Sequence, residues 1–193
     1  MFKPRKWIIA ISLLYTAQAI AQPAEPRYTY LEAGYVDIDL NDVDADGDGF
    51  ALGGSLALGD AFYLAGSYAD YDLNFGIDAQ ELLLGVGYHY GLSSGLDLVA
   101  EGGYAHTEID TQFGDFDDSG LYLSGGLRWM ALERLELNGR VRYVDLDDSG
   151  DGTALLLGGL FHVTPDLALG GGVELSDDSD VYNIGFRLYL GAR

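Results

Sequence analysis

The sequence predicts an all-β fold, a ten-stranded antiparallel transmembrane β-barrel with up-and-down connections, preceded by a cleaved signal peptide. The last stretch, Val181–Leu190, alternates apolar and polar side chains with a strict period of two, which is typical of a strand with two different faces. Its length is about the 9–11 residues that a tilted strand needs to cross a bilayer. Similar stretches recur along the chain, and in hydrocarbon such strands are stable only when every edge is paired, as in a closed barrel.

The N-terminus has the pattern of an export signal. Basic residues precede the apolar run Trp7–Tyr15, and the small residues Ala19 and Ala21 mark a cleavage site. The run is too short for a membrane-spanning helix, which needs roughly 20 apolar residues. We therefore expect residues 1–21 to be a signal peptide and residues 22–193 to form the barrel.

Ten strands follow from the period-two pattern, taken in chain order. They are Tyr28–Leu40, Gly49–Leu58, Phe62–Tyr71, Glu81–Tyr90, Leu96–Glu108, Gly120–Met130, Leu135–Leu146, Thr153–Val163, Leu167–Leu175 and Val181–Leu190. Each carries a run of large apolar residues on one face, such as Leu31 and Tyr35 in the first strand or Leu121 and Trp129 in the sixth. The connections alternate strictly between short turns, for example Gly59–Ala61, and longer acidic loops. This alternation predicts short periplasmic turns and longer extracellular loops.

The second face of the strands distinguishes a membrane barrel from a soluble one. It is small and nearly uncharged, as in Gly53, Ser55 and Ala57, and residues 22–193 contain no lysine, whereas soluble exteriors carry interspersed charges. Aromatic residues of the apolar face gather toward the strand ends, with Tyr35 near a loop and Tyr88 near a turn. Two such belts match the two interfaces of a bilayer.

The composition narrows the class of partner and the compartment. Removing the three basic residues of the signal peptide from the ten in the chain leaves seven against 31 acidic residues, a net charge of −24. Such a surface repels nucleic acid. The chain has no cysteine, so no disulfide framework supports it after export, and stability must come from the sheet.

The opening of the predicted barrel, YTYLEAGYVDIDLNDVDADGDGFALGGSLALGDAFYLAGSY, carries a family resemblance. The chain resembles small outer-membrane β-barrel proteins of Gram-negative bacteria in the OmpA/OmpX-like style, and more narrowly the diffusible-signal-regulated outer-membrane proteins. The resemblance implies export through the periplasm, contact with the barrel-insertion machinery, outer-membrane lipid and lipopolysaccharide as surroundings, and a monomer. One departure is the C-terminus, where Gly191–Arg193 follows Leu190 in place of a terminal aromatic residue.

Ionisable residues on the inner face form the first candidate site. An arginine facing lipid at the bilayer midplane costs about 2–4 kcal/mol, so these residues must point into the lumen. The predicted lumen ionic network is Glu32, Glu101, Arg128, Glu136, Arg140, Arg142, Glu174 and Arg187. Barrel closure would make Glu32 a neighbour of Arg187, and Arg128 would face Glu136 across a turn. Two interpretations remain open, a structural network that fills the interior and a charged constriction in a narrow pore.

The acidic loops are the second candidate site. Asp42, Asp44, Asp46 and Asp48 alternate before Gly49, which resembles the start of a calcium-binding loop. The twelfth position is Gly53 instead of a bidentate Glu, so this is no EF-hand. Loose binding of Ca²⁺ or another divalent cation and a solvated loop are the two alternatives, and no other cofactor is expected.

Catalysis is the third class considered. The barrel segment has three histidines, of which His89 and His162 are expected in the lumen near the turn end. His106 lies near the loop end with outward parity, and no serine occurs near it in its own strand. No nucleophile and base are recognisable by spacing, so we predict no enzyme. The sequence favours a structural or surface-interaction barrel. A narrow channel is the alternative, and a lipid-modifying or proteolytic barrel enzyme is the least favoured class.

Overall fold

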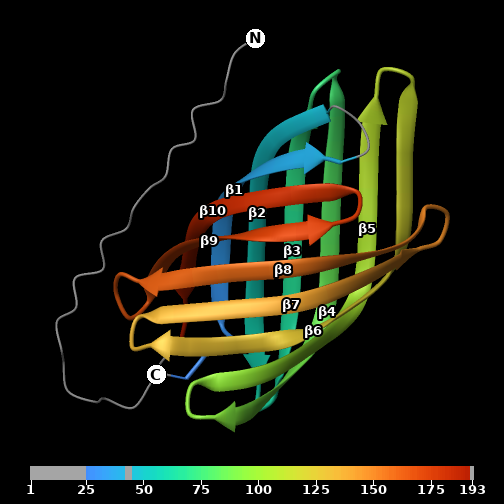
Figure 1. The fold of residues 1–193 in the computed structure, drawn as a ribbon. Coiled ribbons are helices and arrows are strands. Elements are labelled where there is room, and N and C mark those ends of the chain that lie inside the picture. The colour runs from blue at the N-terminus through green and yellow to red at the C-terminus, as the bar shows by residue number, and fades with distance from the viewer. Residues whose placement is uncertain (1–24, 42–44, 192–193) are drawn as a thin grey trace.

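The computed structural model describes residues 25–41 and 45–191 and contains a closed barrel of ten antiparallel strands (Figure 1). The strands are β1 (Tyr30–Leu40), β2 (Ala45–Leu58), β3 (Phe62–Leu73), β4 (Ile77–Ser93), β5 (Leu96–Thr111), β6 (Gly114–Leu132), β7 (Leu135–Leu146), β8 (Gly150–His162), β9 (Leu167–Ser176) and β10 (Ser179–Tyr189). Among the described residues no helix has the length and apolar character needed to span a membrane. The predicted fold class and strand order are confirmed. The predicted signal peptide lies outside the described residues.

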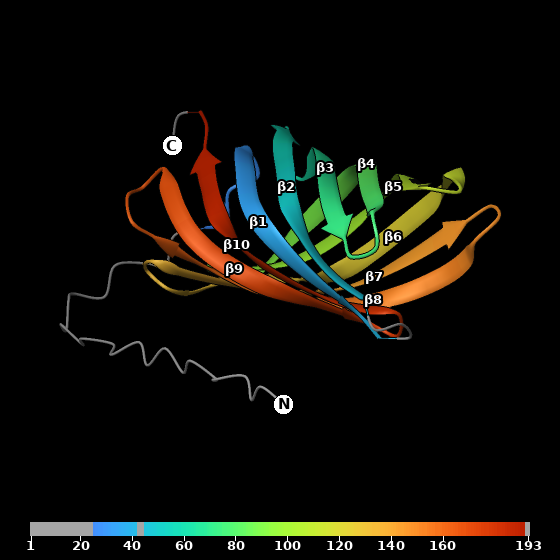
Figure 2. The same cartoon turned by 90° about the horizontal axis from the view of Figure 1, so that it is seen from above.

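The first and last strands close the barrel. Figure 2, seen from above, shows β10 between β9 and β1, and each strand pairs with its neighbours in sequence. The closing register places Glu32 opposite Arg187, and Tyr35 opposite Ile184. Because every described strand is paired on both edges, no open edge faces the bilayer.

The sidedness of the strands follows the predicted pattern. Leu31, Leu121 and Ile184 are 55%, 68% and 68% exposed on the outer wall, whereas Arg128 is 2% exposed inside. Apolar side chains that would be costly to expose to water are tolerated here because hydrocarbon replaces water. The arginines of the strands, Arg128, Arg140, Arg142 and Arg187, lie inside, as the cost of a lipid-facing charge requires.

Most strands are longer than predicted at their loop ends, and this corrects several loop assignments. The predicted strands leave Asn41–Asp48 and Asp110–Asp118 as loops between them. In the structure β2 begins at Ala45, β5 runs to Thr111 and β6 begins at Gly114. The physical reason is an inversion of the pattern. Beyond the outer aromatic belt the outward positions become acidic and the inward positions become apolar, so a search for apolar outward residues ends too early.

Glycines on the inner face make room for two tyrosines that lie against neighbouring strands of the wall. A Cβ atom at Gly87 would lie 2.0 Å from the Tyr63 ring, and one at Gly85 would lie 2.2 Å from the Tyr122 hydroxyl. Both distances are far below van der Waals contact, so only glycine permits these positions. Tyr63 is 1% exposed and Tyr122 is 2% exposed. These two tyrosines therefore fill the interior beside β4.

Candidate functional sites in the lumen and at the outer rim

A buried ion pair closes the turn end of the lumen. An Arg128 guanidinium nitrogen lies 2.7 Å from Oε1 of Glu136, whose side chain also accepts a hydrogen bond from the Tyr189 hydroxyl at 3.1 Å. A nitrogen of Arg187 lies 3.6 Å from the same carboxylate. Glu136 is 0% exposed. Two arginines therefore share one fully buried carboxylate, which balances part of their charge away from water.

The segment before β1 completes this closure. Tyr28 stacks on His89 with ring centroids 3.9 Å apart, and its hydroxyl donates a hydrogen bond to Asp97 at 2.8 Å. The Arg128 guanidinium lies over the Tyr28 ring at 4.6 Å and donates a hydrogen bond to the carbonyl oxygen of Arg27 at 3.0 Å. The turn-end plug is the set Tyr28, Tyr63, Arg128, Glu136, Arg187 and Tyr189, all of which are buried.

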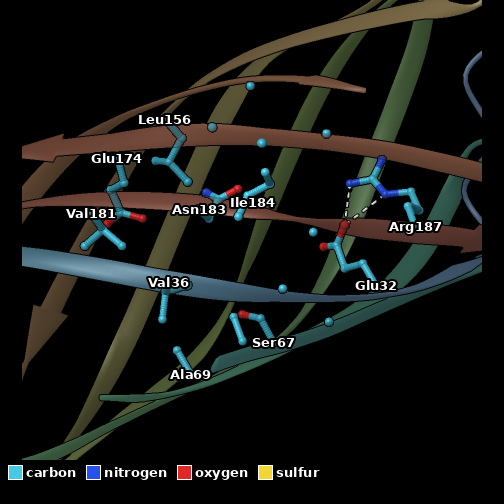
Figure 3. Close-up of a pocket in the computed structure, with 18 of the residues that line it drawn as sticks. Glu32, Val36, Ser67, Ala69, Leu156, Glu174, Val181, Asn183, Ile184 and Arg187 are labelled. Atoms are coloured by element: carbon cyan, nitrogen blue, oxygen red, sulfur yellow. Dashed lines mark hydrogen bonds and ion pairs between the residues drawn. The ribbon is translucent and has the colours of Figure 1, made fainter. Parts of the chain in front are cut away.

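The remaining predicted lumen residues pair above the plug. Arg187 donates two hydrogen bonds to Glu32, at 2.7 and 2.9 Å, as Figure 3 shows. Higher in the barrel, Arg140 pairs with Glu101 at 3.4 Å. The structure thus brings together the residues that face one another across the closing strands and across the β6–β7 turn.

Arg142 binds two carboxylates from different strands. It forms an ion pair with Glu174 of β9 and lies 3.7 Å from Glu81 of β4. The sequence prediction did not include Glu81, Asp97, Tyr28 or Tyr189. The alternation within the strands predicts that the side chains of Glu81, Asp97 and Tyr189 point inward. The position of Tyr28 depends on how the N-terminal segment enters the barrel, which the alternation does not predict.

Two cavities lie on opposite sides of the plug. One of about 330 Å³ is lined by polar lumen residues that include Glu32, Asn183 and Arg187 (Figure 3). The other, of about 550 Å³, lies at the turn end and is lined by residues that include Arg27 and His162. The two have no lining residue in common. Arg128 lines the first and Glu136 the second, so their ion pair lies between the cavities.

The predicted calcium-binding loop is only partly described. Asp42 and Asp44 lie outside the described residues. The prediction that Asp46 and Asp48 lie in a loop is wrong, because both belong to β2. Asp46 lies opposite Asp39 of β1, and Asp48 lies opposite Asp37. Within the part of the chain that the structure describes, no three His, Asp or Glu side chains are grouped closely enough to hold a metal ion.

Carboxylates on the outer wall instead form a band, which we call the acidic girdle. Its members face one another directly across neighbouring strands. The opposed pairs are Asp39–Asp180, Asp37–Asp48, Asp39–Asp46, Asp48–Asp72, Asp72–Asp78, Asp78–Asp110, Asp110–Asp115, Glu108–Asp117 and Asp145–Asp151. No Lys or Arg occurs between Arg27 and Arg128 in the sequence to balance them. Directly opposed like charges destabilise a sheet.

The girdle begins two residues beyond the outer aromatic belt. Tyr35 is followed by Asp37, and Tyr143 by Asp145. Two residues of strand span roughly 6–7 Å. The first carboxylates of the girdle, such as Asp37 and Asp145, therefore lie at the level of lipid headgroups when the aromatic belt lies at the membrane interface, and the others lie farther out.

An inward carboxylate, Asp118, fixes the β7–β8 loop and is 4% exposed. It accepts hydrogen bonds from the backbone amides of Ser149 at 2.7 Å and Asp148 at 3.2 Å. The bonds from Ser149 and from the amides of Ser119 and Asp148 outweigh burial and hold the pKa of Asp118 below its ordinary value. A lowered folded-state pKa means that this stabilisation is complete above the unfolded pKa, near 4, and is lost as the pH falls through the folded-state value.

We expect the Asp118→Asn substitution to accelerate amide hydrogen exchange of Asp148 and Ser149 by about tenfold at neutral pH, because the charge-assisted bonds are lost. The difference between parent and variant should narrow below pH 4. Asp147→Asn, at an exposed position of the same loop, is the control. A parent and variant with equal exchange rates at neutral pH would contradict this role for Asp118.

A serine and a histidine meet on the outer wall near the loop end. His106 Nδ1 lies 3.0 Å from Oγ of Ser119 in the neighbouring strand, and the Tyr104 hydroxyl lies 2.8 Å from the same oxygen. The sequence prediction, which searched within one strand, missed this pair. No carboxylate of the described residues lies within 4.0 Å of the His106 ring to orient it. A serine hydroxyl and an imidazole are thus in contact, and the described part of the chain places no carboxylate beside them to complete a triad.

Comparisons with known proteins agree with the architecture. A sequence model of the family described as "Outer membrane protein beta-barrel domain" matches residues 8–193. No match was found among curated proteins. Similar solved structures include the N-terminal β-barrel domain of OprF from Pseudomonas aeruginosa, with 17% identity, coverage of 83% of this chain and 98% of that one, and a TM-score of 0.47.

Two further solved structures are similar. OprG from Pseudomonas aeruginosa is 16% identical, with coverage of 89% and 99% of the two chains and a TM-score of 0.48. Ail, the attachment invasion locus protein of Yersinia pestis, is 12% identical, with coverage of 84% and 97% and a TM-score of 0.44. Likeness at this level supports no conclusion about what the chain binds.

Proposed function

The chain belongs to the outer membrane protein beta-barrel domain family, and we propose that it is a structural, surface-interacting barrel of the outer membrane whose acidic girdle binds divalent cations. The observation that carries this proposal is the set of directly opposed carboxylates around the outer wall. Hard divalent cations prefer carboxylate oxygens, and weak sites on extracellular modules bind Ca²⁺ with dissociation constants on the order of 10⁻⁴–10⁻³ M.

The position of the girdle identifies the surroundings that it fits. Carboxylates at headgroup level would repel the phosphates of anionic outer-leaflet lipid such as lipopolysaccharide. A divalent cation held between a girdle carboxylate and a lipid phosphate removes both repulsions, that between neighbouring strands and that between protein and lipid. The barrel would thereby be anchored in the outer leaflet through shared cations.

The turn-end plug favours this role over a narrow channel. A conducting path must pass Arg128 and Glu136, which are 2% and 0% exposed, and Tyr63, which is 1% exposed. Four-fifths or more of the lumen side chains of Arg140 and Glu101 are also buried. An enzymatic role receives less support, because His106 lacks an orienting carboxylate among the described residues.

We expect millimolar Ca²⁺ to raise the thermal unfolding temperature of the protein in lipid nanodiscs. The triple variant Asp37→Asn, Asp39→Asn, Asp48→Asn should be more stable than the parent without Ca²⁺, because opposed like charges are removed, and should gain about half as much or less from added Ca²⁺. Asp60→Asn, in the β2–β3 turn at the opposite end, should behave as the parent does.

Sodium chloride at matched ionic strength separates binding from screening, because screening depends on ionic strength and not on the identity of the cation. If NaCl stabilised the parent as much as CaCl₂ did, cation binding by the girdle would be disproved.

A further inference from the structure

Two aromatic side chains stand at the outermost end of the barrel without packing partners. Phe113 is 91% exposed and Phe75 is 76% exposed, the highest values among the large hydrophobic residues described. Phe113 follows the belt residue Tyr104 by nine positions, roughly 30 Å of strand, or about 20 Å of height at a 45° tilt. The bilayer that explains the exposed apolar wall therefore does not explain these two rings.

The two tips are neighbours. Phe75 lies in the β3–β4 turn and Phe113 in the β5–β6 turn, and the strands between them are paired so that Ile77 of β4 lies opposite Thr111 of β5. Phe75 is two residues before Ile77 in the chain, and Phe113 is two residues after Thr111, so both lie two residues beyond this pair. Both hairpins reach the loop end of the barrel (Figure 1).

Both turns are held in place by side-chain hydrogen bonds. The backbone amide of Phe113 donates to the Thr111 hydroxyl oxygen at 3.1 Å, and that hydroxyl donates to the carbonyl oxygen of Gly114 at 2.9 Å. On the other hairpin, Asn74 donates to Asp46 through its backbone amide, at 3.0 Å, and through its side chain. The rings are thus presented from fixed turns, which lowers the entropy lost when a partner binds.

The backbone at Phe75 adds a second argument. Its φ is 70°, and that of the following Gly76 is also 70°. The turn between the paired residues Leu73 and Ile77 has three residues, and positive φ at two of them favours Asn or Gly, so a bulky side chain is rare there. A large aromatic residue therefore occupies the position at which turn geometry disfavours it most.

The surroundings of the tips specify the chemistry of a partner. The nearest outward residues are the girdle carboxylates Asp72, Asp78, Asp110, Asp115 and Asp117. From these observations we propose that Phe75 and Phe113 form a docking surface for a cationic amphipathic polypeptide segment. Apolar side chains of the segment contact the rings, and its Lys or Arg side chains meet the carboxylates. The inference rests on the proposed surface role and names the class of partner.

The size of the surface fits a short segment. Each aromatic side chain can bury about 150–250 Å², so the two rings offer far less than the 800 Å² per partner of a standard interface between folded proteins. Aromatic anchors of this kind typically dominate the binding energy.

Fluorescence anisotropy with the full-length mature protein in nanodiscs tests the proposal. The probes are two labelled peptides of equal length and charge, one of Lys and Leu and one of Lys and Ser. We expect the Lys–Leu peptide to bind more tightly, and the double variant Phe75→Ser, Phe113→Ser to bind it about tenfold more weakly, with no change for the Lys–Ser peptide. Gln112→Ser, in the same turn as Phe113, is the matched control and should bind as the parent does.

Each alternative result overturns the proposal in a recognisable way. Equal binding of both peptides by the parent would show that the surface recognises only charge. This result would disprove the aromatic docking surface and would leave the cation-binding proposal unaffected. Unchanged affinity in the double variant would have the same meaning. A Phe113→Trp reporter in a Trp129→Phe background whose fluorescence is quenched by a lipid-borne quencher would place the tip in the membrane and disprove docking of a polypeptide.

Discussion

Replacing Glu136 with Gln should lower the free energy of unfolding by about 3–5 kcal/mol, the range measured when one partner of a buried ion pair is removed. Glu136 is 0% exposed and lies within 4 Å of both Arg128 and Arg187. Glutamine keeps the shape and one hydrogen-bond acceptor but removes the charge, so the buried Arg128 would lose its counter-charge and Arg187 would keep only Glu32. Urea unfolding in lipid vesicles, followed by fluorescence of the lipid-facing Trp129, measures the loss.

Two controls locate the cause of this loss. Glu133→Gln, in the exposed β6–β7 turn, should change stability by no more than about 0.5 kcal/mol. The apolar pair Arg128→Met, Glu136→Leu should recover much of the stability, because both charges leave together. A Glu136→Gln variant within 1 kcal/mol of the parent would show that the two arginines do not depend on this carboxylate.

The barrel could be predicted from the sequence because bilayer physics constrains every strand in the same way. The period of two, the small inner residues and the alternation of turn lengths each follow from pairing all backbone groups inside hydrocarbon. Even the pairing of Glu32 with Arg187 could be anticipated, because closure of the barrel fixes which residues of β1 and β10 are opposite. Beyond the outer aromatic belt hydrocarbon no longer requires outward side chains to be apolar. Most predicted strands therefore end near that belt, although the strands of the structure continue past it.

The strand ends and the plug depended on information that no local pattern contains. Asp110–Asp118 resembled a loop because acidic residues took the outward positions, yet the ladder continues there with Ile109 opposite Phe116. Tyr28 was assigned to a regular first strand, but it lies before β1 and stacks inside the lumen. The Ser119–His106 contact also joins two strands, and its distance depends on a register that spacing within one strand cannot reveal.

The turn-end plug should keep the parent protein electrically silent in planar lipid bilayers, and removing two of its rings should open a path. Tyr28 and Tyr63 are 6% and 1% exposed and stack with centroids 5.0 Å apart, so the double variant Tyr28→Ala, Tyr63→Ala empties the volume beside the Arg128–Glu136 pair. Water entering this space would join the two cavities that the plug separates. We expect discrete ion-conducting events in the variant and none above the lipid background in the parent.

A matched pair of aromatic substitutions distinguishes an opened lumen from a damaged membrane seal. Tyr143→Ala and Tyr182→Ala remove rings of the outer belt on the lipid-facing wall and leave the plug untouched. This second double variant should remain silent. Circular dichroism and thermal unfolding of both variants in the same lipid establish that each is folded before recording. Conductance in the parent would favour the narrow-channel alternative, because ions would then pass a plug whose charged groups are 2% and 0% exposed. A folded but silent plug variant would show that the ion pair seals the lumen without the tyrosines.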